Sequence, residues 1–458
     1  MNEVPSIDKL LELVKNDAWK ALSEHFRHVH PVDIAELIGA APASQQGQIF
    51  EIVDDAVKPN VLAELEGAVD SSIIESLPIS ELSDIVEDMA PDDAADLLAE
   101  IPEERSAQVL QHMEEEESED VRRLLQYKED SAGGIMTTDV VSMREEQSVQ
   151  EALDAIAHLD TREQFFHANI VDTSGRMIGF IDVWELLREK QRTRPLGELV
   201  HRDFKAATVD MDQEEVAQIM HRYDLTVIPV VEDNGKLIGR ITSDDVIDVI
   251  EEEASEDIFR LAGSDDVELE TTSPIASCVV RLPWLLITLV GGLISALILR
   301  NFHARISHTL VLAAFVPVVM AMGGNAGIQS STLVVRSLAL GTINRRNVLW
   351  LLVKEVLSGA LMGIACGVII GVLSAILISM SPEASSSLLP QHLASILGLA
   401  LFCAMTFAAV FGAIVPILLD RVKIDPAVAS GPFVTITNDI IALLIYFAIT
   451  TQFIYEQS

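Results

Sequence analysis

Five apolar segments, each long enough to cross a lipid bilayer, follow one another after residue 280. They lie near residues 282–300, 309–336, 348–380, 392–419 and 427–454. A helix of about 20 apolar residues spans the roughly 30 Å hydrocarbon core of a bilayer, where every backbone polar group must be hydrogen-bonded within the protein. Residues 274–458 are therefore expected to form an all-α transmembrane domain with five spans.

The rest of the chain has the opposite character. Residues 274–458 contain nine Lys and Arg against six Asp and Glu, whereas residues 1–273 contain 22 against 64, a net charge of −42. This division excludes an ordinary soluble enzyme, and so acidic a surface repels nucleic-acid phosphates. We expect a multidomain membrane protein, in contact with a lipid bilayer, whose acidic N-terminal half is soluble and which has no nucleic-acid partner.

Basic residues in the short loops indicate how the spans are oriented. With the N-terminus inside, the cytoplasmic flanks hold Arg281, Arg336, Arg345, Arg346, Arg421 and Lys423, and the outer loops hold Arg300 and Arg305. The first residues lack the basic and apolar regions of a secretion signal. We expect a multi-pass protein of the cell (inner) membrane with a cytoplasmic N-terminus and, because five is odd, an extracytoplasmic C-terminus.

One carboxylate, Asp439, lies about midway along the fifth span, with no basic residue within a turn. A charge at this depth is costly and marks a position that faces water, an ion or a partner. The alternative is a protonated Asp439 that is hydrogen-bonded to a neighbouring helix. Lys354 and Glu355 differ from it, because they are adjacent near the cytoplasmic start of the third span and can either pair with each other or snorkel to the membrane surface.

The second span contains glycines and polar residues in the run MGGNAGIQSST (322–332). Such a run either lets helices pack closely or interrupts the helix to line a polar pathway. Together with Asp439 and Gly431-Pro432 in the fifth span, it favours the pathway. The donors are carboxylate, hydroxyl and amide oxygens without His or Cys, a set that suits Mg²⁺, Ca²⁺ or Mn²⁺ better than Zn²⁺ or Cu⁺.

Residues 1–130 read as short helices. Proline recurs at intervals of 11–19 residues, each time before an amphipathic run such as PVDIAELI (31–38) or PDDAADLL (91–98). Proline suits the first turn of a helix, and Asp or Glu there complements the helix dipole. We expect a helical N domain whose helices stack as a small superhelical array.

An internal repeat follows. HANIVDTSGRMIGFID (167–182) and VIPVVEDNGKLIGRIT (227–242) share a strand, Gly turn, strand pattern at an offset of 60 residues, and helical runs flank each copy. Two tandem β-α-β-β-α units of this kind resemble a pair of CBS domains, here residues 131–195 and 196–250, with an α+β fold.

The two copies differ at one motif. The second contains Gly239-x-x-Thr242-x-x-Asp245, which is similar to the ribose-holding motif of nucleotide-binding CBS domains. The resemblance implies an adenine nucleotide at this second module. The first copy has Asp182 and Glu185 in the corresponding places, which disfavours a nucleotide there.

The connection to the first span, DDVIDVIEEEASEDIFRLAG (244–263), is expected to be an acidic helix, and the connecting segment as a whole covers residues 251–273. The simplest interpretation is a solvated charged linker. However, like charges at this density destabilise a helix, and a divalent cation that bridged them to other acids would relieve the repulsion. The segment is therefore a candidate ion sensor.

The order of these parts resembles the MgtE family of magnesium channels. The most specific pieces are GGNAG (323–327) followed by QSST, DPAVASGPFV…ND (425–439) and YDL…PVV…TSDDVIDVIEEEASEDI (223–258). The resemblance implies a homodimer whose pore lies on the two-fold axis between spans two and five, with Asp439 holding hydrated Mg²⁺. Asn325, Thr332 and Thr435 match pore-lining positions, whereas Ile328 departs from a second Asn in the family's GGNxGNQ.

The same resemblance implies regulation by cytosolic Mg²⁺, which would join the N domain, the CBS pair and the connecting ("plug") helix and close the pore. The implied metal ligands are Asp92, Asp93, Asp96, Asp212, Asp224, Asp245, Asp248, Glu253, Glu256 and Asp257. The expected function is a Mg²⁺-selective channel or transporter that imports Mg²⁺, with Mg²⁺ as both transported and regulatory ion. One alternative is a CBS-regulated transporter of Mn²⁺ or Co²⁺. Another is a CBS-regulated intramembrane enzyme, which the lack of an HExxH motif disfavours, so we do not expect an enzyme.

Overall fold

The computed structural model describes residues 6–65, 67–158, 165–264, 274–306, 310–343, 347–379, 390–427 and 431–455. It divides into two compact units, Met1–Ile250 and Glu251–Ser458, which are considered separately below. Several sequence expectations lie outside the described residues, namely the connecting segment after Ser264, the side chain of Arg305, Arg345, Arg346 and the tail after Tyr455.

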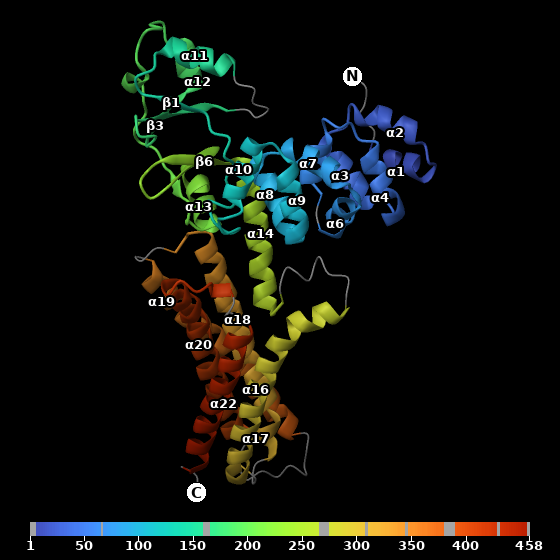
Figure 1. Cartoon of the computed structure of the whole chain (residues 1–458). Coiled ribbons are helices and arrows are strands. Elements are labelled where there is room, and N and C mark those ends of the chain that lie inside the picture. The colour runs from blue at the N-terminus through green and yellow to red at the C-terminus, as the bar shows by residue number, and fades with distance from the viewer. Residues whose placement is uncertain are drawn as a thin grey trace. The chain divides into compact units, whose positions relative to one another are not determined.

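The described residues up to Leu124 form short helices, as expected (Figure 1). Each odd-numbered helix from α1 to α7 packs on the next odd-numbered one, and α8 packs on α10, so the helices stack as a superhelical array. Their bounds are α1 Ile7–Lys15, α2 Trp19–Phe26, α3 Pro31–Ala40, α4 Ala43–Glu51, α5 Lys58–Ala63, α6 Gly67–Ser76, α7 Ile79–Glu87, α8 Pro91–Glu100, α9 Glu103–His112 and α10 Glu115–Leu124.

The prolines of this region stand at helix starts, where a fixed φ and a missing N–H cost little. Pro31 and Pro91 are the first residues of α3 and α8, Pro59 is the second residue of α5, and Pro42, Pro78 and Pro102 directly precede α4, α7 and α9. The prolines that predicted these helices therefore also mark where the helices begin.

Two three-stranded sheets follow, in the orders β1-β2-β3 and β4-β5-β6. In each sheet the first pair of strands is parallel and the second antiparallel, with a register shift at Ile170/Val171 in one and Val230/Val231 in the other, so the internal repeat is confirmed. The bounds are β1 Ser142–Arg144, α11 Val149–Ala157, β2 His167–Val171, β3 Met177–Asp182, α12 Val183–Arg188, a 3₁₀ turn Leu196–Glu198, β4 Ala207–Thr208, α13 Gln213–Tyr223, β5 Val227–Val231 and β6 Leu237–Thr242.

The segment before the first strand of each module pairs with the hairpin of the other module. Main-chain hydrogen bonds run both ways between Phe180 and His201 (3.2 and 2.9 Å) and between Arg240 and Thr137 (3.0 and 2.9 Å). Gly179, at φ 156°, permits the first crossing, because a Cβ there would collide with the carbonyl oxygen of His201. The two modules are thus joined at equivalent places.

Helix α14, Ser243–Ala262, contains 20 residues. It begins as the last helix of the second CBS-like module and continues without a break through the acidic connecting sequence, which confirms the helix expected over 244–263. One helix therefore carries both the motif residue Asp245 and the acids that lead toward the membrane.

The second unit contains the five expected spans, which by length and composition are Pro274–Phe302, Leu312–Ala339, Val348–Leu377, Gln391–Arg421 and Pro432–Phe453. The helices that carry them are α16 Pro274–Ile306, α17 Leu310–Ala314 with α18 Val316–Ala339, α19 Val348–Ser379, α20 Pro390–Arg421 and α22 Pro432–Tyr455 (Figure 1). Many exposed leucines, isoleucines and valines cover α16 and α19. Such faces are stable in lipid and costly in water.

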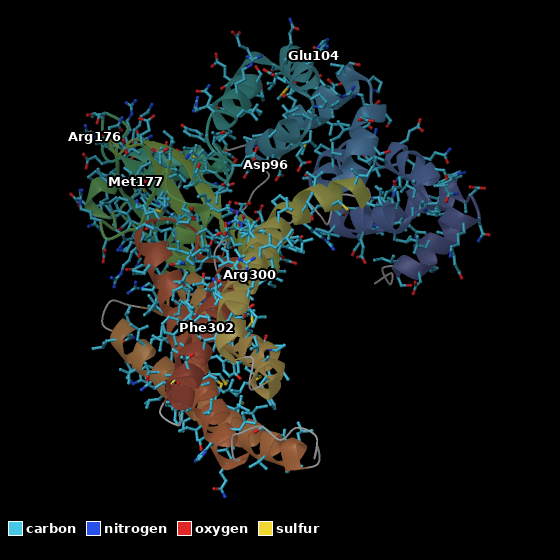
Figure 2. The ribbon with its side chains drawn as sticks, turned by 90° about the horizontal axis from the view of Figure 1, so that it is seen from below. Asp96, Glu104, Arg176, Met177, Arg300 and Phe302 are labelled. Atoms are coloured by element: carbon cyan, nitrogen blue, oxygen red, sulfur yellow. The ribbon has the colours of Figure 1, made fainter. Side chains whose placement is uncertain are left out.

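Small residues bring these helices together. A Cβ on Gly363 of α19 would lie 2.9 Å from the Cα of Phe402, and one on Gly367 would lie 2.7 Å from the carbonyl oxygen of Gly398 in α20. On the other side of the unit, Phe302 of α16 stacks on Phe447 of α22 with ring centroids 4.5 Å apart (Phe302 is labelled in Figure 2). Close backbone packing through glycine is typical of membrane helices.

We predict that Gly367→Val lowers the melting temperature of the detergent-solubilised protein by several degrees. The new side chain meets backbone rather than a movable side chain, and overpacking of this kind costs about 1–3 kcal/mol. Gly292→Val is the matched control, because a Cβ at Gly292 of α16 has nothing within 4 Å. Equal melting temperatures for the two variants would contradict the close packing of α19 on α20.

Candidate ion pathway and acidic clusters

Asp439 of α22 lies against α18 at a glycine. A Cβ on Gly324 would lie 2.9 Å from Oδ1 of Asp439 and 3.6 Å from Cγ2 of Thr435, one turn earlier in α22. Helix α18 is continuous through this run of glycines, so the interrupted helix considered from the sequence is wrong and the close-packing interpretation holds for the backbone. Close packing does not exclude a polar pathway, because the glycines let the Asp439 carboxylate approach the surface of α18.

The Asp439 side chain is half-buried and has no hydrogen bond or ion pair with any other residue that the structure describes. A carboxylate retained in a membrane helix without such a partner carries a desolvation cost that nothing in the described chain offsets. The alternative of a carboxyl hydrogen-bonded to a neighbouring helix is not realised. Asp439 therefore remains open to an external ligand.

The expected pore-lining residues fall in two places. Thr435 shares the Gly324 contact with Asp439, and its hydroxyl donates to the carbonyl oxygen of Gly431 at 2.9 Å. Asn325 and Thr332 are exposed on α18 with Ile328 between them, so the three lie on one face at helical spacing. This face presents the Asn325 amide and the Thr332 hydroxyl, which form no hydrogen bonds to other described residues of the helix.

A second membrane carboxylate, Glu355, has a partner other than the one expected from the sequence. Glu355 of α19 is only 4% exposed and accepts a hydrogen bond from the hydroxyl of Ser330 in α18, whereas Lys354 is exposed. Adjacent residues on a helix do not face each other, so the pairing of Lys354 with Glu355 expected from their proximity in sequence does not occur. Applied to the sequence, this spacing rule predicts that Glu355 faces a different side of the helix from Lys354.

The end of α14 packs on the segment that enters α22. Arg260 forms ion pairs with Glu256 and with Asp425. Burial raises the pKa of Asp257 to about 6, and the nearby carboxylates of Asp425 and Glu253 add to the effect. The Arg336 guanidinium acts in the opposite direction on the pKa of Asp257, so six charged groups meet where the acidic helix ends, two of them the cations Arg260 and Arg336.

The contact is close at the backbone as well. A Cβ on Gly263 would lie 3.2 Å from Cγ of Pro432, the first residue of α22, and a Cβ on Gly431 would collide with the carbonyl oxygen of Leu261. Because α22 carries Asp439, a displacement of the last turn of α14 acts directly on the helix of the candidate pathway.

A separate acidic cluster lies in the N-terminal unit. The pKa of Asp96 in α8 is raised to about 7, first by crowding that reduces its hydration and then by Asp93, Glu100, Glu129 and Asp245. Figure 2 labels Asp96 among the many oxygen-tipped side chains of these helices. Carboxylates from α8, α14 and the segment between the N domain and the first module are therefore close enough to repel one another.

Asp245 also belongs to the nucleotide-like motif. Its carboxylate accepts hydrogen bonds from the backbone N–H and hydroxyl of Thr242, at 3.0 and 2.7 Å, while burial raises its pKa. The motif is therefore folded, with Thr242 and Asp245 facing each other.

The remaining expected metal ligands have separate surroundings. Asp212 caps α13 by accepting from the N–H of Glu214, and Asp224 ends the same helix in the left-handed conformation at φ 52°. Asp92 lies with Asp93 in the first turn of α8, and Asp248 is exposed on α14. The structure brings Asp93, Asp96 and Asp245 together in one cluster and Glu253, Glu256 and Asp257 in another.

Family models match about three quarters of the chain. Residues 316–449 match the MgtE divalent cation transporter, residues 29–130 match the MgtE intracellular N domain, and residues 132–192 and 196–252 match the CBS domain. Among curated proteins, the magnesium transporter MgtE of Thermus thermophilus is 35% identical, over 71% of this chain and 70% of the relative. The chain belongs to the MgtE family.

Other MgtE proteins give the same result. The magnesium transporters MgtE of Enterococcus faecalis and Bacillus subtilis are each 33% identical, over 72% and 73% of this chain and 71% and 72% of their own lengths. The family consists of ion transporters, so the expectation of a transporter rather than an enzyme is confirmed, as is the multi-pass membrane fold.

The solved cytosolic domain of an Mg²⁺ channel MgtE, crystallised in complex with ATP, has a similar fold. It matches with a TM-score of 0.50 and 30% identity, over 53% of this chain and all of that domain. The soluble half of this chain thus shares the MgtE arrangement of N domain and CBS pair.

We predict that Gly324→Ala reduces divalent cation flux in proteoliposomes by about tenfold or more while the protein still folds. The new methyl group displaces the Asp439 carboxylate, and a misplacement of about 1 Å at a functional group is enough for a large loss. Gly292→Ala serves as the control. Normal flux through Gly324→Ala, with an unchanged elution profile, would show that the contact between α18 and Asp439 is irrelevant to transport.

Proposed function

We propose that this protein is a Mg²⁺-selective channel or transporter that imports Mg²⁺ across the cell membrane and is closed by cytosolic Mg²⁺. The observation that carries the proposal is Asp439, a carboxylate in a membrane helix, packed on Gly324 and without a partner in the described chain. Mg²⁺ dehydrates reluctantly and binds through one or two carboxylates while it keeps several waters. A single carboxylate flanked by amide and hydroxyl groups suits such a hydrated ion.

The pore is proposed to form between two copies of the chain. The face of α18 that carries Asn325 and Thr332 is exposed in the single chain although it is polar, and lipid does not solvate such groups. In a homodimer with a two-fold axis beside α18 and α22, this face and Asp439 of both copies line one water-filled path. Trp184, Ile247 and Ile250 are exposed on the CBS-like modules and provide apolar surface for the same dimer.

The proposed orientation has the N-terminus in the cytoplasm. Arg336 at the end of α18 and Arg421 at the end of α20 lie at helix ends expected on the cytoplasmic side, together with Lys423 just beyond. Basic residues are enriched in cytoplasmic loops. This orientation puts the acidic unit in the cytosol and the C-terminus outside.

Regulation is proposed to arise from the two acidic clusters. Each holds several carboxylates at a distance where they repel, and Mg²⁺ bound between them removes the repulsion only while the cluster stays assembled. A ligand that binds one state selectively stabilises it by RT ln(1 + [Mg²⁺]/Kd), about 0.4 kcal/mol per site at a concentration equal to Kd. A switch from mostly open to mostly closed needs about 5.5 kcal/mol, so several weak sites must act together and closure is steep in the millimolar range.

An adenine nucleotide is proposed to bind at the second CBS-like module. Thr242 and Asp245 are arranged as a hydroxyl and carboxylate pair, and the segment before β1 pairs Thr137 with Arg240 of β6, the strand that ends at Thr242. The Thr137 hydroxyl is buried and has no hydrogen-bond partner among the described residues. A relative of this fold was crystallised with ATP, which supports the same ligand class here.

We predict that Asp439→Asn lowers Mg²⁺ uptake into proteoliposomes by about 100-fold, because the amide keeps the size but loses the charge that attracts a divalent ion. Uptake is followed with a Mg²⁺-sensitive dye, with Ca²⁺, Mn²⁺ and Co²⁺ as competing ions. Asp420→Asn, at an exposed carboxylate near the end of α20, is the charge-matched control. Wild-type uptake by Asp439→Asn would reject the proposed pathway, and preferred uptake of Mn²⁺ or Co²⁺ would reject Mg²⁺ selectivity.

We also predict that Asp96→Asn combined with Asp245→Asn raises the internal Mg²⁺ concentration needed for half-closure several-fold. The pair Glu103→Gln and Glu104→Gln, at exposed positions of α9, replaces the same number of carboxyl groups elsewhere in the N domain. A shift in the first variant alone indicates coordination within the cluster. Equal shifts in both variants would mean that only the total charge matters.

A further inference from the structure

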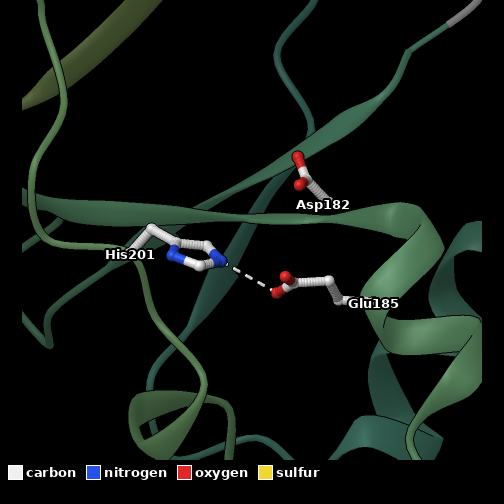
Figure 3. A group of neighbouring side chains, drawn as sticks. All are labelled: Asp182, Glu185 and His201. Atoms are coloured by element: carbon white, nitrogen blue, oxygen red, sulfur yellow. Dashed lines mark hydrogen bonds and ion pairs between the residues drawn. The ribbon is translucent and has the colours of Figure 1, made fainter.

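The first CBS-like module carries a side-chain cluster that the transport mechanism does not use. Oxygen atoms of Asp182 and Glu185 and a ring nitrogen of His201 all lie within 4.8 Å of one another (Figure 3). Nε2 of His201 is 2.8 Å from Oε2 of Glu185. Asp182 and Glu185 stand where the second module has Thr242 and Asp245, and His201 adds an imidazole from the segment that begins the second module.

Local structure holds each of the three residues in place. Asp182 ends β3 and precedes α12, and Glu185 follows three residues later in the first turn of that helix, which puts both carboxylates on one side. His201 comes from the segment between the modules and is fixed by its two main-chain hydrogen bonds to Phe180. The cluster thus joins three different elements of the fold.

A second histidine contacts the cluster through Asp182. His167 of β2 is the cross-strand partner of Asp182, and its Nε2 lies 3.0 Å from Oδ1 of that carboxylate. The Phe180 ring packs against both imidazoles, edge-on to His167 at 5.1 Å and tilted to His201 at 5.5 Å between centroids. Ligating carboxylates of metal sites are commonly oriented by such an outer hydrogen bond.

We propose that Asp182, Glu185 and His201 bind a divalent d-block cation of the zinc type, with His167 orienting Asp182. Imidazole nitrogen suits Zn²⁺, Ni²⁺ or Co²⁺, whereas Mg²⁺ takes oxygen ligands. Ligands held about 2.0–2.1 Å from a tetrahedral ion lie roughly 3.3 Å apart, so the observed separations need only small side-chain shifts. All three side chains reach solvent, which gives the ion access and leaves room for a water as a fourth ligand.

The site has a structural consequence. Because His201 belongs to the segment that links the two modules, a bound ion would tie this segment to the start of α12. The cation would therefore stiffen the CBS pair at a place distinct from the acidic clusters proposed to bind Mg²⁺.

The test measures Zn²⁺ binding to the full-length protein in detergent by equilibrium dialysis, with about 10 mM Mg²⁺ present to occupy oxygen-only sites. We expect one Zn²⁺ per chain at micromolar free Zn²⁺. His201→Ala should weaken binding by about 100-fold and His167→Gln by about tenfold. His221→Ala, at an exposed histidine of α13, is the control and should bind as the wild type does.

Glu185→Gln provides a second variant, at a residue of α12 rather than in the segment that connects the two modules. Its side chain is exposed, so the substitution leaves the fold intact, as circular dichroism can verify. Weaker Zn²⁺ binding in both Glu185→Gln and His201→Ala supports the site. The absence of stoichiometric Zn²⁺ in the wild type, or unchanged affinity in both variants, would overturn it and leave His201 and Glu185 as a simple ion pair.

Discussion

Repulsion between carboxylates is the interaction on which the soluble part of this protein depends. The N-terminal 273 residues carry a net charge of −42, and the fold does not spread this charge evenly. It concentrates acids around Asp96 and Asp245 in one unit and around Asp257 and Asp425 in the other, where the pKa of Asp96 and that of Asp257 are raised. Such an arrangement is unfavourable by itself and becomes favourable when a divalent cation occupies it. The proposed regulation follows from this arrangement, because a cation that binds between these carboxylates would favour the assembled conformation.

Helix α14 connects this repulsion to the candidate pathway. Its first half contains Asp245. Arg260 in its last turn forms an ion pair with Asp425, in the segment before α22, and Gly263 just beyond it contacts Pro432, the first residue of α22. Along α22 the next polar positions are Thr435 and Asp439, which rest on α18 at Gly324. Two helices that pack through glycine transmit small shifts, because the contact has no flexible side chain to absorb them. The proposed ion sensing and the proposed ion passage would thus share one helix contact.

Much of this organisation could be predicted from the sequence, because it rests on local patterns. Apolar length predicted the five spans, prolines predicted the helix starts of the N domain, and the 60-residue repeat predicted the paired modules. What could not be predicted depends on partners distant in the chain, such as Ser330 for Glu355 and Asp425 for Arg260. The continuity of α18 was also missed, since the cost of glycine in a helix is offset by close packing on α20 and α22 that only the tertiary structure reveals.

The most direct measurement is the rate of tryptic cleavage after Arg260 in the purified full-length protein, with millimolar Mg²⁺ and with EDTA. Sodium chloride at matched ionic strength separates coordination from simple screening. We expect cleavage about tenfold slower or more in Mg²⁺ than in either control, because the bound cation holds the end of α14 against the start of α22. Equal rates in Mg²⁺, EDTA and sodium chloride would contradict the claim that divalent cations assemble the acidic clusters.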